Sequence, residues 1–300
     1  MNPIHFIERI DLIQKVKESV EQKKGFAMGK LGFSEQFLLG YLPFKETKPG
    51  NVQLKAYEAL LRYHCEIQFG VFPTHATFLH EFAQFYTKQV QQIDILGLFQ
   101  AHQEEKIIKA NYLRAYFIPY QMTEPDRSIP ANESNCYLPY FEGKKLLFIS
   151  PFADLLKSRA TKNTFESVWS TIQKKWFHPS QVCSYEIPYS YVNSIQTHKK
   201  YRNSINLFGE ICSNIGRMDF DIALIGAGAL GLPLAGYLKG QGKTAISVGG
   251  HLQVLFGVRG ARWSKDGFWT KNYFNPHWIE MPEKYHPENK SMLTDNSAYW

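Results

Sequence analysis

The sequence predicts an α/β protein with a Rossmann-like parallel sheet in the C-terminal half and a mainly helical N-terminal part. Two observations support this prediction. From residue 144 onward, apolar stretches of strand length alternate with stretches of helix length, which is typical of a parallel sheet whose strands are connected by helices. Before residue 120, apolar residues recur mostly at the three- to four-residue spacing of amphipathic helices.

Composition shifts along the chain suggest four parts. Residues 1–120 form the helical N-terminal part, which contributes the loop GKLGFSE, and residues 144–265 form the nucleotide-binding half. Between them, residues 121–143 contain several prolines and turn-forming residues, which favours a loop or a linker. The last part, 266–300, is an aromatic tail that we expect to pack on the core.

In the N-terminal part, apolar spacing predicts several helices and one strand. Ser34 is placed to cap a helix that Pro43 and the following TKPGN stretch end. Pro73 and Thr74 introduce another helix. The predicted elements are helices over 5–23, 34–42, 52–69, 76–90 and 104–113 and a strand over 113–120.

In the C-terminal half, four apolar runs predict buried strands separated by helices. The strands are predicted over 144–150, 182–190, 221–226 and 243–250. The helical regions between and after them are predicted over 151–177, 194–217, 229–241 and 251–257. Because ligands of open parallel sheets bind outside the carboxyl ends of the strands, three loops matter most: Ser150 to Phe152, Gly226 to Gly231, and Gly249 to His251.

The stretch Gly226-Ala-Gly-Ala-Leu-Gly231 has the G-x-G-x-x-G spacing of a dinucleotide-binding turn, between a predicted strand and a predicted helix. That fingerprint also needs an acidic residue at the end of the next strand, and no acidic residue occurs from Ile222 through Lys265. NAD is therefore not favoured. The glycines, with Gly228, let a phosphate approach the backbone and the next helix N-terminus, or they serve only tight packing of strand and helix.

The next loop repeats the arrangement with Gly249 and Gly250, followed by His251 and Gln253. A histidine here can bond a phosphate or transfer a proton, because its reference pKa is near neutrality. The alternative is a polar residue at the rim of the site.

Charge indicates the class of partner. The chain has 34 basic and 27 acidic residues, a net charge of +7, which suggests nucleic acid, phosphorylated small molecules or lipid headgroups. No clustered basic tract, zinc-finger pattern or RNP-like motif is present, which argues against nucleic acid. The four cysteines are widely spaced and lack the pattern of a zinc site.

The sequence does not indicate export or a membrane span. Its first residues carry charges throughout and lack the features of a secretory signal, so we expect a cytoplasmic protein. The uncharged run from Ile222 to Leu238 is at the lower length limit for a span and contains Pro233. A buried strand followed by a buried helix explains it better.

Residues 220–263, FDIALIGAGALGLPLAGYLKGQGKTAISVGGHLQVLFGVRGARW, resemble the C-terminal signature of a poorly characterised group of proteins associated with surface-polysaccharide synthesis. The stretch LLFISPFADLLKSR (146–159) and the final Tyr299-Trp300 fit the same group. More remotely, the layout is similar to glycosyltransferases of the GT-D fold. These carry an Asp-x-Glu signature within Arg-Phe-Gly-Asp-Gly-Glu near the N-terminus.

The corresponding stretch here is Lys30-Leu-Gly32-Phe33-Ser-Glu35. The resemblance implies that Lys30, Gly32 and Glu35 take part in donor binding, and that Glu35 contributes to a Mn or Mg site. Phe33 stands where the family has Asp, so the resemblance leaves one carboxylate for the metal, which is a poor site by itself. Glu35 is also a candidate base for an acceptor hydroxyl, or a cap of its own helix.

The resemblance implies a glycosyltransferase that moves a sugar from a nucleotide-sugar donor, most simply a UDP-sugar, to a glycan or lipid-linked acceptor of cell-surface glycan synthesis. Peripheral contact with an anionic membrane face fits the basic charge. Alternatives are a non-catalytic nucleotide or nucleotide-sugar binding protein and an NAD(P)-dependent oxidoreductase. The predicted catalytic residues are Glu35 and His251. The predicted donor-binding residues are Lys30, Gly32, Ser150, Pro151, Phe152, Gly226, Gly228, Gly231, Gly249, Gly250 and Gln253.

Overall fold

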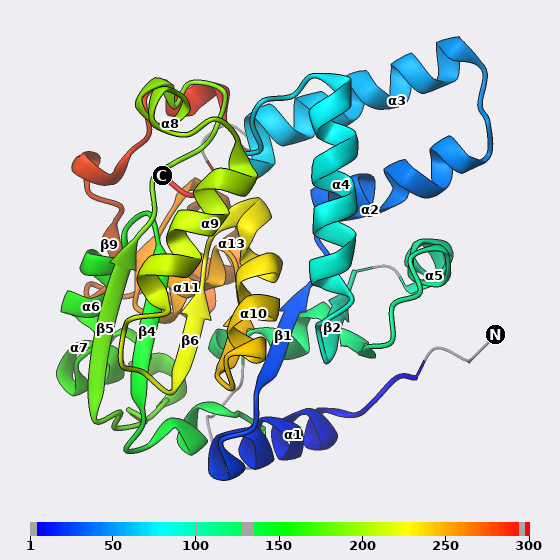
Figure 1. Ribbon diagram of the computed structural model, residues 1–300. Helices are drawn as coiled ribbons and strands as arrows, with labels where there is room; N and C mark the ends of the chain where they lie inside the picture. Colours follow the sequence, from blue (N-terminus) through cyan, green and yellow to red (C-terminus); the bar gives the residue numbers. More distant parts are fainter. Residues whose placement is uncertain (1–4, 100, 128–134, 294–297) are drawn as a thin grey trace.

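The computed structural model describes residues 5–99, 101–127, 135–293 and 298–300. A seven-stranded sheet lies between two layers of helices (Figure 1). All neighbouring strands of this sheet run parallel. The predicted α/β class and parallel sheet are therefore confirmed.

The strands, in spatial order across the sheet, are β3 (Tyr116–Pro119), β2 (Ile95–Leu98), β1 (Phe26–Lys30), β7 (Thr244–Ser247), β6 (Ile222–Ile225), β4 (Lys145–Ser150) and β5 (Gln181–Glu186). A second, two-stranded sheet pairs β8 (Val258–Arg259) with β9 (Ile279–Glu280). The four strands predicted in the C-terminal half correspond to β4, β5, β6 and β7.

The large sheet is not confined to the C-terminal half, contrary to the expectation from the sequence. Strands β1, β2 and β3 come from the part predicted to be mainly helical, and β1 pairs directly with β7. The runs that form β1 and β2 are short and buried on both faces, so they show no alternation that would reveal a strand. The division into four parts stays a prediction, although the sheet draws strands from both sides of segment 121–143.

The helices divide between the two faces of the sheet according to the buried cluster that they join. One face is covered by α2 (Phe33–Glu46), α3 (Asn51–Tyr63), α4 (Ala76–Val90), α5 (Ala101–Ala110), α9 (Ser204–Ile215) and α10 (Gly231–Gly240). The other is covered by α1 (Arg9–Gln22), α6 (Ala153–Arg159), α7 (Lys162–Val168), α11 (His251–Leu255), α12 (Ala261–Ser264) and α13 (Gly267–Asn272). Helix α8 (Ile195–Lys200) precedes α9.

Short single-turn helices complete the connections. They include the π-helix η1 (His64–Phe69) and the 3-10 turns η2 (Tyr120–Thr123), η3 (Pro125–Arg127), η4 (Leu138–Phe141), η5 (Ser170–Ile172), η6 (Gly228–Leu230), η7 (Glu283–Tyr285) and η8 (Lys290–Met292).

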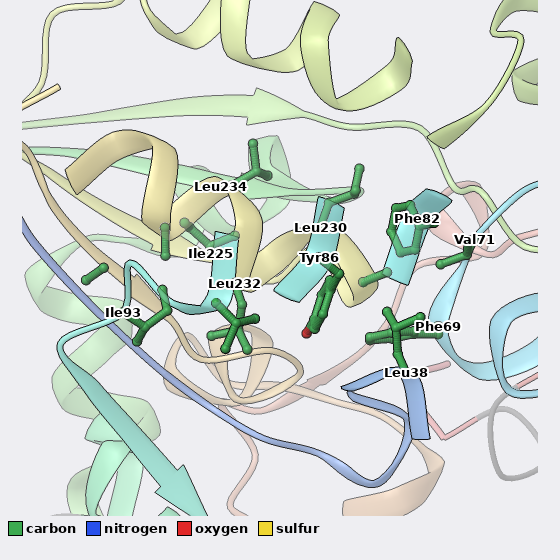
Figure 2. Packing of buried hydrophobic residues seen from close by; sticks show 14 of the residues in the cluster. Leu38, Phe69, Val71, Phe82, Tyr86, Ile93, Ile225, Leu230, Leu232 and Leu234 are labelled. Carbon is green, nitrogen blue, oxygen red and sulfur yellow. The ribbon is translucent and has the colours of Figure 1, made fainter. Parts of the chain in front are cut away.

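Each strand sends alternate side chains into the two cores, as the two-residue period of a strand requires. In β6, Ala223 and Ile225 join the cluster with α10 and α4, while Ile222 and Leu224 join the opposite cluster. Figure 2 shows part of the first cluster, in which Ile225 lies near Leu232 and Leu234 of α10, and Tyr86 and Phe82 of α4 lie farther along. The run from Ile222 to Leu238 is thus a buried strand and helix. No helix among the described residues combines the length and apolar character needed to cross a membrane.

Helix α2 continues through Pro43 to Glu46 instead of ending there. A proline inside a helix removes the hydrogen bond to the carbonyl four residues earlier, here that of Leu39. The buried side chain of Asn111 donates to this carbonyl instead, with Nδ2 2.9 Å from the Leu39 oxygen. The helix passes the proline because a distant side chain supplies the missing donor.

Candidate functional site

A cavity of about 710 Å³ opens at the carboxyl end of the sheet, over the loops that follow β1, β7, β6 and β4. The chain leaves β4 outward to the edge strand β5 but leaves β6 inward to β7. Neighbouring strands whose connections diverge in this way leave a crevice at their carboxyl ends, where open α/β sheets bind ligands. The fold therefore places the cavity where the sequence predicted a site.

Most of the predicted site residues line this cavity. They are Lys30, Gly32, Glu35, Pro151, Phe152, Gly226, Gly228, Gly249, Gly250, His251 and Gln253. Ser150 is fully buried instead, and its hydroxyl accepts a hydrogen bond from the backbone N–H of Phe152 at 3.3 Å. Gly231 begins α10 beneath the cavity, where an added Cβ would lie 2.5 Å from Ser247 Oγ. Ser150 and Gly231 therefore stabilise the conformation of the loops instead of lining the cavity.

The glycine turns after β6 and β7 pack against each other. Gly228 and Gly249 have positive φ angles of 48° and 58°, a conformation that glycine adopts without strain. A Cβ on Gly226 would lie 2.9 Å from the carbonyl oxygen of Gly249. The glycines therefore meet a packing requirement and also leave backbone exposed along the cavity.

Glu35 lies in the first turn of α2, and its carboxylate folds back over Gly32. An added Cβ on Gly32 would lie 2.4 Å from Glu35 Oε2, and the backbone N–H groups of Gly32 and Glu35 hydrogen-bond the carboxylate. Burial raises the pKa of Glu35 to about 7, although these hydrogen bonds and the charge of Lys30 act in the opposite direction. Glu35 thus caps its own helix and titrates near neutral pH.

The Glu35 loop is a poor fit to the Mn or Mg ion that the family resemblance implies there. A hard divalent cation needs several oxygen ligands. This loop offers one carboxylate, and backbone N–H groups already bond it. Phe33, which replaces the family's aspartate, leaves 65% of its surface exposed.

His251 lies in a buried cluster of charged residues that includes two carboxylates. Its Nδ1 is 2.8 Å from Asp126 Oδ2, and its Nε2 is 3.0 Å from Glu124 Oε1. The same Glu124 oxygen is 2.8 Å from Lys30 Nζ. Burial by itself lowers the pKa of His251, but the charges of Asp126 and Glu124 outweigh it and raise the pKa above its ordinary value.

Glu124 and Asp126 reach His251 because the backbone of η2 packs closely on the end of β2. The turn η2 lies on the end of β2, where a Cβ on Gly97 would be 2.9 Å from the Cα of Tyr120. Beyond η2, Lys174 donates a hydrogen bond to the carbonyl of Pro125, and Tyr137 donates to that of Thr123. Residues 123–125 of the predicted linker are thereby fixed across the sheet end.

Sequence reasoning missed Glu124 and Asp126 because they lie in segment 121–143, which was assigned to a loop or linker. One signal points to them: two acidic residues flank Pro125 soon after the predicted strand 113–120, in a chain with a net charge of +7. Their partner His251 is 125 residues away from Asp126, which no local pattern reveals.

No family model matches the chain, and no curated protein matches its sequence. Among solved structures, the chain is similar to one described as "The highly conserved domain of unknown function 1792 has a distinct glycosyltransferase fold". The match covers 80% of this chain and 77% of that chain at 13% sequence identity, with a TM-score of 0.41.

A further part of the cavity lining is aromatic. The rings of Tyr189 and Tyr191 are stacked with centroids 5.9 Å apart, and Trp300 Nε1 donates to the Tyr189 hydroxyl at 2.9 Å. The guanidinium of Arg262 lies 5.0 Å from the ring centroid of Tyr299. The aromatic tail thus packs its tryptophans into the core, as buried Trp269 and Trp278 show, and brings its last two residues to the cavity.

Polar residues of the π-helix line the cavity beside α2. His64 Nδ1 lies 2.7 Å from Gln68 Oε1, and Ser34 Oγ donates to the same oxygen at 3.1 Å. The ring of Phe37 stacks on His64 with centroids 4.7 Å apart. This π-helical turn follows α3 directly, ends at Gly70, and presents His64 and Gln68 to the cavity.

Proposed function

We propose that this protein transfers a sugar from a nucleotide-sugar donor to a hydroxyl acceptor in cell-surface glycan synthesis. One observation supports the proposal above the others. A single cavity of about 710 Å³ brings together the glycine turns, Lys30 and Glu35, a carboxyl group whose pKa is about 7. This volume lies within the ordinary range for small-molecule sites, roughly 300–1,000 Å³.

The donor, most simply a UDP-sugar, would place its diphosphate against the glycine turns. Gly228 and Gly249 expose backbone that a phosphate can approach. The Lys30 side chain runs beside this turn, since a Cβ on Gly249 would lie 3.8 Å from Lys30 Cε. Amides and a cation fixed in this way stabilise charge that develops on a departing diphosphate.

In the proposed reaction, the oxygen of an acceptor hydroxyl forms a bond to the anomeric carbon of the donor sugar. The bond from that carbon to the diphosphate oxygen breaks, and its electron pair leaves with the nucleoside diphosphate. Glu35 accepts the hydroxyl proton, because a carboxyl group whose pKa is near the working pH is suited to general base catalysis. The acceptor, a glycan or a lipid-linked sugar, and contact with an anionic membrane face remain part of the proposal.

We propose for His251 a role other than the catalytic one expected from the sequence, which stays a prediction. Both of its ring nitrogens lie within hydrogen-bond distance of carboxylates, so neither is free to exchange a proton with a substrate. We assign it the role of holding Glu124 and Asp126 beneath the cavity.

Ligand-dependent thermal stabilisation tests the donor. Purified protein is screened with UDP-sugars, GDP-sugars, UDP, NAD and NADP, each with and without manganese. The proposal expects stabilisation by a nucleotide-sugar and not by the dinucleotides. Stabilisation by NAD or NADP alone would replace the transferase with the oxidoreductase alternative.

One observation favours the second candidate, a non-catalytic nucleotide-sugar binding protein. The carboxylate of Glu35 is bonded to its own helix N-terminus, and Phe33 occupies the position of the family's aspartate. A donor-hydrolysis assay on the stabilising nucleotide-sugar separates the two candidates, because only a transferase releases nucleoside diphosphate from it.

A further inference from the structure

Glu124, Asp126 and His251 form a compact group of metal-binding side chains. Each offers one ligand atom, and these atoms all lie within 4.8 Å of one another. The two carboxylates are fully buried, and His251 is 7% exposed. Asp126 lies in η3 and His251 in α11, which pack together, and Glu124 lies between η2 and η3.

A second observation concerns one oxygen atom of Asp126. Asp126 Oδ1 is buried and has no hydrogen-bond partner among the described residues, while Oδ2 of the same carboxylate bonds His251. An unsatisfied buried carboxylate oxygen is strongly unfavourable. A bound cation at the cluster would satisfy this oxygen without requiring a hydrogen bond.

We propose that Glu124, Asp126 and His251 bind a divalent transition-metal ion such as Mn²⁺, Co²⁺ or Zn²⁺. One imidazole nitrogen and the carboxylate beside it are ligands that these ions accept, whereas Mg²⁺ and Ca²⁺ prefer oxygen ligands alone. The ion bonds one ring nitrogen of His251. The carboxylate at the other ring nitrogen keeps its hydrogen bond and fixes the ring, as partners of metal-binding histidines commonly do. The ligands of this site differ from Glu35, and the proposal does not depend on glycosyl transfer.

Two lysines lie close to the proposed site, and their positive charges should weaken metal binding. Lys30 Nζ is 2.8 Å from Glu124 Oε1, an oxygen that the cluster offers to the ion. Lys174 is buried beside the same segment and donates to the Pro125 carbonyl. Since each positive charge raises the electrostatic energy of a nearby cation, removing the charge of Lys30 must strengthen metal binding.

The test measures metal binding on untagged, metal-stripped protein by isothermal titration with Mn²⁺, Co²⁺ and Zn²⁺. Tryptophan fluorescence gives a second readout, because the rings of Trp263 and Trp269 lie 5.8 Å and 6.3 Å from the His251 ring and paramagnetic Mn²⁺ and Co²⁺ quench nearby indoles. We expect one ion per chain. Asp126→Asn should weaken binding at least tenfold, in line with the loss of a ligand or of the ligand's orienting partner.

Asp154→Asn is the matched control, because it makes the same substitution at an exposed residue of α6. It should leave the affinity unchanged. Lys30→Met should raise the affinity severalfold, which a general loss of structure would not do, so it keeps the test decisive if Asp126→Asn fails to fold. The proposal is overturned if none of the three ions binds, if Asp126→Asn binds as the parent does, or if Lys30→Met fails to strengthen binding.

Discussion

Lys30 and Glu124 form an ion pair, Nζ to Oε1 at 2.8 Å, in which the Glu124 side chain is fully buried and the Lys30 side chain is 18% exposed. The pair joins the end of β1 to the segment after β3, across the end of β2. Removing one partner of a buried pair leaves an uncompensated charge, which destabilises far more than the loss of the contact itself.

Glu124→Gln should therefore lower the free energy of unfolding by about 3–5 kcal/mol, measured by urea denaturation. The double variant Lys30→Met/Glu124→Gln should recover part of this loss, because it removes both charges. Asp219→Asn breaks the exposed pair with Lys145 and should change stability by about 0–1 kcal/mol. Equal losses in the two single variants would contradict the importance of the buried pair.

Glu35 should make both activity and stability depend on pH near neutrality. Its pKa in the folded protein is about 7 against an ordinary value of 4.5, so the folded state holds this proton more tightly than the unfolded chain. Its contribution to stability is full below pH 4.5 and is lost as the pH rises towards 7. The rate of donor turnover should rise as the pH rises towards 7, because Glu35 acts as a base only when it is ionised.

Glu35→Gln should remove this pH dependence of stability and lower turnover about 10²- to 10⁴-fold while donor binding is retained. Glu46→Gln, at the exposed far end of α2, is the control and should keep the parental profile in both measurements. Full turnover in Glu35→Gln would remove the base role.

Asn111 should stabilise α2 through the carbonyl that Pro43 leaves without its helical donor. Asn111→Ala should cost about 1–3 kcal/mol, the penalty of an unsatisfied buried polar group. In a Pro43→Ala background the same change should cost less, because the restored N–H of residue 43 can bond the Leu39 carbonyl. A double-mutant cycle by chemical denaturation measures this coupling, and additive effects would show that the two positions are independent.

Gly97 should control the placement of Glu124 and Asp126. In Gly97→Ala the new Cβ would meet the Tyr120 backbone at 2.9 Å, so η2 must move away from β2. Such overpacking typically costs about 1–3 kcal/mol, and the affinity for Mn²⁺ or Co²⁺ should fall with it. Gly209→Ala in α9 meets nothing within 4 Å and should instead stabilise by about 0.5–1 kcal/mol. If Gly97→Ala leaves the metal affinity unchanged, η2 does not control the positions of Glu124 and Asp126.

Strands β4, β6 and β7 were predictable because each is a buried apolar run close to glycine, proline or charged residues. Strands β1 and β2 lie among helical patterns and were not predicted. Gly29 and Gly97 also interrupt these runs, and each occupies a point where another segment approaches closely. In such strands the glycine reports tertiary packing, which local sequence does not specify.

The candidate site, like the sheet, was predictable only in part. The glycine turns follow strands that were predicted, so the strand prediction brought them together. Lys30 and Glu35 lie at and after the end of β1, which was not predicted, and were singled out by the resemblance to the GT-D motif. The partnership of His251 with Glu124 and Asp126 depends on how far η2 and η3 reach across the sheet. That reach is set by Gly97, Tyr137 and Lys174, which lie far apart in the sequence.

The pairing of β1 with β7 has a consequence for how this chain is made. During synthesis, β1 leaves the ribosome early, but the neighbour that completes its hydrogen bonding ends at Ser247. Until then β1 and β6 each present an open strand edge, of the kind that pairs with other chains. Assembly of the sheet must therefore wait until β7 has been made, and long-range pairing of this kind folds slowly. Nascent chains truncated before Thr244 should depend on chaperones that shield such edges.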